Sequence, residues 1–409
     1  MNRFRFSEWM RGSLLAIPAL FVLGAVGLSA LTLFVGQRVG TPSFASVLFR
    51  GGSETAQTVL STIAASTITL TGLVFSVTML VLQLTSSRYS PRVLRTFLRD
   101  RTSKVTLGVF VGTFTYCLAV LRTIDTDSDT QPGLATSVAV LLALATVAAF
   151  VQYINHIARR IRVSSIIESV ATDTDAAIEV HFPEAGPDDP AGPPDEEAAG
   201  AVVPSKNKGV LLVVDVAKLI ACARREQCQV DVLVRAGEFV PRGAPLFQVR
   251  PAGAAERVGK SLERHVALGS ERTMEGDPAY GFRQLVDIAE LSLSPAVNDP
   301  TTAVQALDAI HDLLRRLAGL PFPTGRHLDQ DGRLRVRVPE MTWDDYLDLA
   351  VDEILLYGRG SVQVTGKLRS MLQDLAAATS PERRQAVRRK SVQLARADDV
   401  PLPGPAGPA

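Results

Sequence analysis

The chain of 409 residues contains few of the residue types that disulfide scaffolds and metal sites need. It has three cysteines and five histidines. Three cysteines give no disulfide framework, and Cys222 and Cys228 lie in a segment without a histidine, which is a poor arrangement for zinc. We therefore predict free thiols and no bound metal.

Signatures of catalysis are also missing. The sequence has no HExxH motif, no GxSxG nucleophile elbow and no dinucleotide glycine fingerprint. The basic runs lack the interleaved aromatic residues that favour nucleic-acid binding. We predict that the protein is not an enzyme, has no catalytic residues and no cofactor, and does not bind nucleic acid.

Charged residues are absent from four long apolar runs in the N-terminal part of the chain. A helix that rises about 1.5 Å per residue needs roughly 20 apolar residues to cross a hydrocarbon core of about 30 Å, and the third run is only just long enough. The runs predict four transmembrane helices at about 13–35, 58–84, 105–121 and 134–154. The first is too long for a signal peptide and is read as an uncleaved anchor.

Lys and Arg are distributed unevenly between the segments that join these runs. Twelve basic residues lie in the N-terminal tail, in the loop after the second run and just after the fourth run, against three on the opposite side. Because short cytoplasmic loops carry the excess of positive charge, we predict a bacterial inner-membrane protein with both termini in the cytoplasm.

The fold class that follows is a membrane α-helical domain with four transmembrane helices, followed by a cytoplasmic α+β region with a small β-rich module and helical hairpins. The linker between them is rich in acidic residues, Pro and Gly. The predicted divisions are a transmembrane domain at 1–160, a helical extension at 161–182, the linker at 183–200, the β-rich module at 201–255, a mostly helical domain at 256–398 and a disordered tail at 399–409.

A stripe of hydroxyl side chains runs along the second apolar run. Its members share one helical face because they are spaced by four or seven residues: Thr62, Ser66, Thr69, Ser76 and Gln83. Hydroxyls are common where membrane helices pack against each other. Repeated around the axis of a homo-oligomer, the same stripe would line a polar, uncharged pore. Both interpretations stay open at this point.

The loop that follows is rich in arginine: Arg88, Arg92, Arg95 and Arg99. Ser90 is a suitable N-cap and Pro91 suits the first helical position, so we predict a short amphipathic helix in the headgroup layer, in contact with anionic lipids. The alternative is a loop that merely follows the positive-inside rule. At the mouth of a pore, these arginines would favour anions.

The region between 271 and 303 holds a second group of polar candidates: Arg283, Gln284, Asp287, Asn298 and Asp299. Arg283 and Asp287 are one helical turn apart and suit an ion pair. Asp299 before Pro300 suits a helix cap. Alternatively, the five side chains form a polar pocket whose arginine and helix N-terminus would favour an anion.

Three segments carry a resemblance to a known family: SRYSPRVL, ERTMEGDPAYGFRQLVDIA and LSPAVNDPTTA. Together with the four-span layout they resemble a bacterial family of predicted polytopic membrane proteins, domain of unknown function 2254. Glu290–Leu291 departs from the pattern. The resemblance implies topology and domain order, and no substrate. The expected function is an oligomeric ion channel or transport-related protein with a cytoplasmic regulatory domain; the alternative is a membrane-anchored scaffold or sensor.

Overall fold

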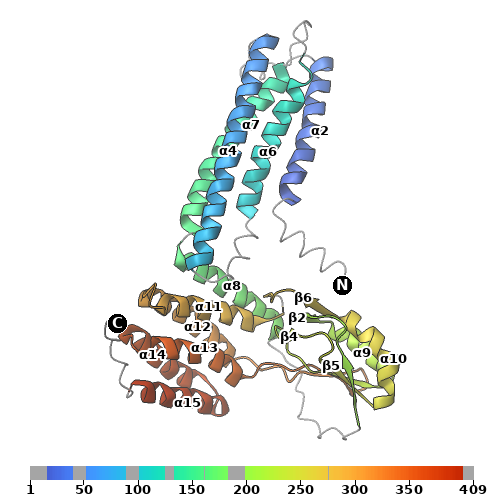
Figure 1. Ribbon diagram of the computed structural model, residues 1–409, viewed down its shortest axis with the longest axis vertical. Helices are drawn as coiled ribbons and strands as arrows, with labels where there is room; N and C mark the ends of the chain where they lie inside the picture. The colour runs from blue at the N-terminus through green and yellow to red at the C-terminus, as the bar shows by residue number, and fades with distance from the viewer. Residues whose placement is uncertain are drawn as a thin grey trace, which may run out of the picture. The chain divides into compact units, whose positions relative to one another are not determined.

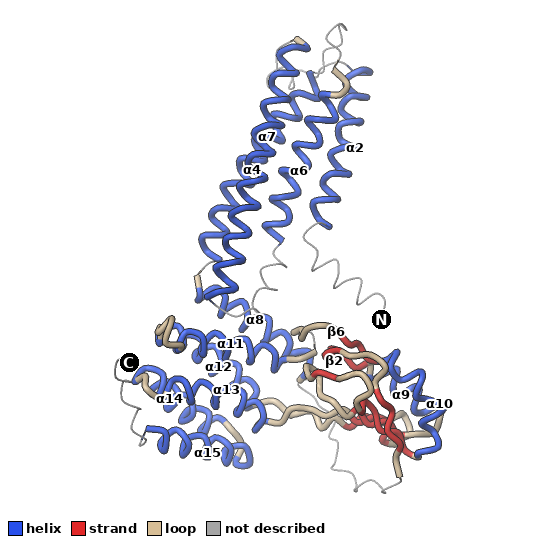
Figure 2. Tube along the Cα trace, in the orientation of Figure 1, coloured by secondary structure: helices blue, strands red, loops and turns tan. Residues whose placement is uncertain are grey.

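The computed structural model describes residues 16–39, 52–88, 101–124, 133–160, 162–182, 199–274 and 276–398. The chain divides into two compact units, Asn2–Arg162 and Val163–Ala409. The first is a bundle of long helices, and the second combines helices and strands (Figures 1 and 2). The predicted helix from Ser90, most of the acidic linker and the C-terminal tail fall outside the described residues.

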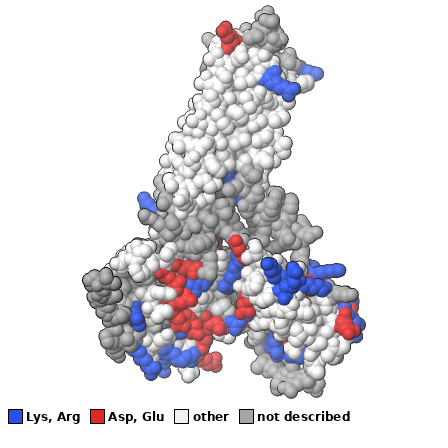
Figure 3. Space-filling model, in the orientation of Figure 1, with Lys and Arg blue, Asp and Glu red and all other residues white. Residues whose placement is uncertain are grey.

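Four helices build the described part of the first unit: α2 (Ala16–Val39), α4 (Ser53–Arg88), α6 (Arg101–Leu121) and α7 (Gly133–Arg160). Each contains a stretch long and apolar enough to cross a membrane: Ala16–Gly36, Ser53–Gln83, Thr102–Leu121 and Gly133–Ile157. In Figure 3 the surface of this bundle is free of charged side chains over most of its length. The four predicted apolar helices are confirmed.

Close approach of α2 and α6 depends on two glycines of α6. A Cβ atom at Gly108 would lie 2.6 Å from Cδ2 of Phe21, and one at Gly112 would lie 3.4 Å from Cβ of Phe21. The ring of Phe21 therefore occupies the space that a larger residue at position 108 would need. This GxxxG spacing is the type that lets membrane helices pack closely.

Two buried tyrosines connect helices of the first unit by hydrogen bonds. The hydroxyl of Tyr116 donates to the carbonyl of Ala135 at 3.0 Å and lies 2.9 Å from the hydroxyl of Thr32. The hydroxyl of Tyr153 lies 2.6 Å from that of Thr78. Both tyrosine side chains are fully buried, so these bonds satisfy polar groups that would otherwise be costly in an apolar interior.

Two small sheets lie in the second unit. A five-stranded sheet has the order β1-β5-β3-β8-β7, and a three-stranded sheet has the order β4-β2-β6. The strands are β1 (Ala201–Pro204), β2 (Gly209–Val214), β3 (Gln229–Val232), β4 (Phe239–Val240), β5 (Pro245–Arg250), β6 (Val266–Gly269), β7 (Arg326–Leu328) and β8 (Leu334–Arg337).

The sheets share one apolar core with α9 (Val216–Arg225) and α10 (Ala255–Leu262). Leu219, Phe247 and Val258 lie in this core. The larger sheet extends beyond the predicted 201–255 module, because β8 joins it in parallel with β3, with Val336 opposite Val230. Strands far apart in the sequence thus complete the sheet.

The remaining helices form the rest of the second unit: α8 (Val163–His181), α11 (Pro278–Leu293), α12 (Pro300–Ala318), α13 (Trp343–Gly358), α14 (Val362–Ala378) and α15 (Pro381–Asp398). The starts of α11, α12 and α13 have side-chain caps. Asp277 accepts from the backbone N–H of Tyr280, and Thr342 forms a capping box with Asp345. Such caps satisfy N–H groups that the helix itself leaves without partners.

An aromatic cluster fixes the end of α8 against α11 and α13. The ring of Phe182 meets those of Phe322 and Tyr346 edge to face at 5.1 and 6.1 Å between centroids. Phe282 meets Tyr346 at 5.3 Å. Farther along, Gly281 of α11 faces the side chain of Thr174 of α8, so the two helices approach closely at this point.

We predict that Gly281→Ala destabilises the second unit. An added Cβ atom would overlap the hydroxyl of Thr174 and lie 2.7 Å from its Cβ. Overpacking of this kind costs about 1–3 kcal/mol. The midpoint of thermal unfolding of the detergent-solubilised chain should fall, and Thr174→Ala in the same chain should recover part of the loss. The prediction fails if Gly281→Ala unfolds at the same temperature as the unaltered protein.

Candidate functional site

The hydroxyl stripe of α4 lies on the exposed side of that helix. All five predicted members are exposed: Thr62, Ser66, Thr69, Ser76 and Gln83. The buried side of α4 carries Ala56, Leu60, Val74 and Val81, which pack toward α6 and α7. With 100° between successive residues, the centre of the stripe is nearly opposite the buried side. The stripe therefore does not pack against the described helices of its own chain.

Three of the stripe hydroxyls donate to their own helix backbone. Thr62 donates to the carbonyl of Thr58 at 2.7 Å, Thr69 to that of Ala65 at 2.9 Å, and Ser76 to that of Gly72 at 2.9 Å. Bonds of this type satisfy the hydroxyl proton inside the helix. What the stripe presents outward is therefore the lone pairs of the hydroxyl oxygens, which can accept hydrogen bonds or approach a cation.

The stripe is not wholly polar. Leu73 and Leu80 lie within the same arc of the helix and are 48% and 55% exposed. Thr78, by contrast, faces Tyr153 of α7. The hydroxyls that hold the helices of one chain together are thus different from those of the stripe. Sequence spacing identified the stripe, and it did not identify the tyrosine bonds.

The predicted lipid contacts of the arginine-rich loop cannot be placed on the structure. Arg92, Arg95 and Arg99 lie outside the described residues, and Arg88 ends α4 with a side chain that is not described. Anionic-lipid contact stays a prediction.

Arg283 joins the carboxylates of two helices. Its guanidinium donates to Asp287 at 2.6 Å and to Glu290 at 2.9 Å, both on α11, and it also pairs with Glu353 on α13. The side chains of Arg283, Asp287 and Glu290 are 17%, 10% and 23% exposed. The predicted ion pair between Arg283 and Asp287 is thus present, as part of a larger cluster with three carboxylates around one arginine.

The other predicted members of the polar pocket lie elsewhere. Asp299 accepts hydrogen bonds from the backbone and the hydroxyl of Thr302, as the N-cap of α12. Asn298 is exposed and adopts a left-handed backbone conformation with φ of 47°. Arg283 is ten residues before the end of α11, about 15 Å along the helix axis. The structure therefore divides the five residues between the Arg283 cluster, with Gln284 buried on the same helix, and the α11–α12 connection.

Sequence reasoning missed Glu290 and Glu353 as members of this cluster. Burial, and then a hydrogen bond that the protonated carboxyl of Glu290 can donate to the neighbouring Glu353 carboxylate, raise the pKa of Glu290 from 4.5 to about 7. Arg283 opposes that shift. Glu290 follows Arg283 by seven residues, or two helical turns, so the spacing could have indicated their contact. Nothing in the sequence indicates that α11 packs against α13, so Glu353 could not have been found in this way. The arrangement can hold one shared proton between the two glutamates near neutral pH.

We predict that Glu290→Gln removes a pH dependence of stability. Because the pKa of Glu290 is raised in the folded state, that state binds more protons than the unfolded chain between about pH 4.5 and about pH 7, so stability falls as pH rises through this range. The variant should therefore unfold at a higher temperature than the unaltered protein at about pH 8, and at a similar one near pH 4.5.

The matched control is Glu179→Gln on α8, where the side chain is exposed. It should shift the unfolding midpoint equally at both pH values. An equal shift for Glu290→Gln would show that the two glutamates do not share a proton.

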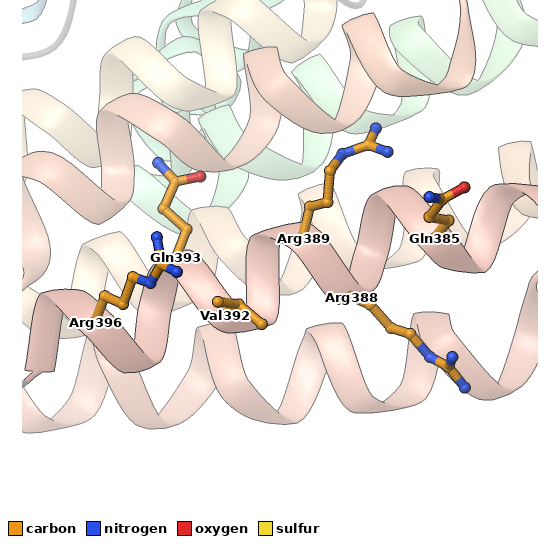
Figure 4. A pocket seen from close by; sticks show the side chains of 6 residues that line it. All are labelled: Gln385, Arg388, Arg389, Val392, Gln393 and Arg396. Atoms are coloured by element: carbon orange, nitrogen blue, oxygen red, sulfur yellow. The ribbon is translucent and has the colours of Figure 1, made fainter.

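A surface hollow on α15 is lined by Gln385, Arg388, Arg389, Val392, Gln393 and Arg396 (Figure 4). All six side chains come from one helix, and Figure 4 shows Arg388 and Arg389 pointing in different directions. Arg389 pairs with Asp344 of α13. The hollow is therefore part of the outer surface of α15 rather than a cleft between elements.

Among the described residues, no group of three or more His, Cys, Asp or Glu side chains is placed to hold a metal ion. The three cysteines are free and buried.

Four membrane-length helices followed by a separate mixed unit define a polytopic membrane protein. The family described as predicted membrane protein (DUF2254) matches residues 11–374, and the chain belongs to this family. Uncharacterized proteins from Mycobacterium bovis and from two strains of Mycobacterium tuberculosis are 30% identical over 401 residues, which cover 95% of this chain and 77% of each relative. No solved structure matches the chain. The resemblance drawn from the three sequence segments is thereby confirmed.

Proposed function

We propose that the protein forms a homo-oligomer in which the stripe of α4 lines a polar path for ions across the membrane. The observation that carries this proposal is the exposure of Thr62, Ser66 and Thr69 on the side of α4 opposite its packing. Around a lone protomer this side would meet lipid tails, which offer no hydrogen-bond partners. Copies of α4 arranged around an axis would cover it and enclose an uncharged polar surface.

The bonding of the hydroxyls bears on which ions this path would favour. Because Thr62, Thr69 and Ser76 donate to their own backbone, their oxygens are acceptors for water or cations. The arginines after α4 act in the opposite sense, since their summed field gathers anions, an effect that weakens with salt. Anion and cation movement therefore have to be measured separately.

We predict ion flux in liposomes that contain the purified protein, and a loss of flux with Thr69→Leu. The substitution replaces an oxygen on the path with an apolar side chain, so flux should fall several-fold. The matched control is Thr172→Leu on α8, an exposed threonine whose hydroxyl also donates to the carbonyl four residues earlier, at 2.8 Å. It should leave flux unchanged.

Three results would contradict the proposal. Flux no higher than in empty liposomes, for anions and for cations, would leave a membrane-anchored scaffold or sensor as the function. Equal loss with Thr69→Leu and Thr172→Leu would mean that the path does not follow α4. Cross-linking between copies through Ser66→Cys, without flux, would make the stripe a packing surface alone.

The orientation that accompanies this proposal places the protein in the bacterial plasma membrane, with Val163–Ala409 as a cytoplasmic regulatory region. It is supported by the twelve basic residues on one side against three on the other.

Reporter fusions test this orientation. We predict that reporters joined after residues 45 and 128 are active outside the cytoplasm, and that a reporter after residue 200 is active inside. Activity outside the cytoplasm at position 200 would reverse the orientation.

A further inference from the structure

Four large apolar side chains are exposed on the second unit at two neighbouring connections. Val297, in the α11–α12 connection, is 45% exposed; Leu356 and Tyr357, in the last turn of α13, are 59% and 60% exposed; Val362, at the start of α14, is 87% exposed. We call these four residues the apolar tip. Exposed apolar residues that gather in this way often mark an interaction surface.

The two connections lie side by side. A Cβ atom at Gly358, the last residue of α13, would lie 3.3 Å from Cδ1 of Leu293, the last residue of α11. It would also lie 2.5 Å from Cγ1 of Val364 on α14. The ends of α11 and α13 and the start of α14 thus meet at one end of the helical part of this unit.

The start of α8 lies at the same end. The other end of α8 is fixed by the aromatic cluster, where Phe182 meets Phe322 after α12 and Tyr346 at the start of α13. His181 confirms this placement, since its Nε2 lies 2.9 Å from Glu340 just before α13. Because α8 and α11 pack side by side (Figure 1), α8 must run back from the cluster toward the apolar tip, antiparallel to α11.

Chain connectivity links this end to the membrane. The apolar stretch of α7 ends at Ile157 and α8 begins at Val163. Six residues span at most about 20 Å even when fully extended. The start of α8 is therefore tethered within that reach of the end of a membrane helix.

We propose that the apolar tip docks on the surface of the lipid bilayer, with Tyr357 at the level of the headgroups and Leu356 and Val362 toward the acyl chains. Tyrosine suits this depth because its ring is apolar and its hydroxyl can reach water. Val180 is a comparison site for the apolar tip: it is also apolar and is 80% exposed, but it lies at the opposite end of α8. The Arg283 cluster nearby carries three carboxylates, so the docking rests on apolar insertion and needs no anionic lipid.

The test uses the full chain in vesicles of phosphatidylcholine alone. A polarity-sensitive fluorophore is attached at Val362→Cys or at Val180→Cys; the native cysteines are buried. Quenching by spin-labelled lipid is compared with quenching by aqueous iodide. We expect the label at position 362 to be quenched several-fold more by the lipid than the label at position 180, and less by iodide.

A second substitution tests the role of the tip itself. Tyr357→Asp in the Val362→Cys chain should abolish the difference in lipid quenching, because a charge at this position opposes insertion, while both labelled proteins stay folded since the residue is exposed. Equal quenching at positions 362 and 180 would overturn the proposal. Protection of position 362 from iodide that depends on protein density and not on spin-labelled lipid would assign the tip to a second copy. None of these readouts depends on ion flux.

Discussion

Inside a bilayer, a backbone N–H or C=O group without a partner is costly because lipid tails offer neither donors nor acceptors. The first unit meets this constraint with four helices whose backbone bonds are internal, and it extends the same solution to its side chains. The hydroxyls of Thr62, Thr69 and Ser76 donate to the preceding turn of α4. A helix rich in hydroxyls can thus remain within a membrane without a polar partner for each proton.

The polar groups of α4 and its neighbours fall into two sets with different roles. Tyr116 and Tyr153 are buried and bond across helices to Thr32 and Thr78, which holds one chain together. The stripe hydroxyls of Thr62, Thr69 and Ser76 donate instead to their own helix backbone, and they face away from the bundle. Packing within the chain is accounted for by the first set, so the second set is available for contacts with further copies or for water.

Glycine allows helices to approach closely in both units. Gly108 of α6 leaves room for the ring of Phe21, and Gly281 of α11 leaves room for Thr174 of α8. The second contact also bears on the proposed docking surface. Because α8 packs along α11, the start of α8 and the apolar tip lie at the same end of the helical part. The Arg283 cluster joins α11 to α13, and the apolar tip lies at the ends of these two helices, so packing, charge and the proposed docking surface depend on one arrangement.

The amino-acid sequence alone was enough to predict the four apolar helices, the shared face of Thr62, Ser66 and Thr69, and the cap at Asp299, because length, periodicity and local hydrogen bonding act over a few residues. It could not determine which way the face of α4 points, since periodicity shows that residues share a side but not what that side meets. Nor could it place Glu353 beside Glu290, or β8 beside β3. Those pairings join segments far apart in the chain, and only the packing of whole helices and strands against one another decided them.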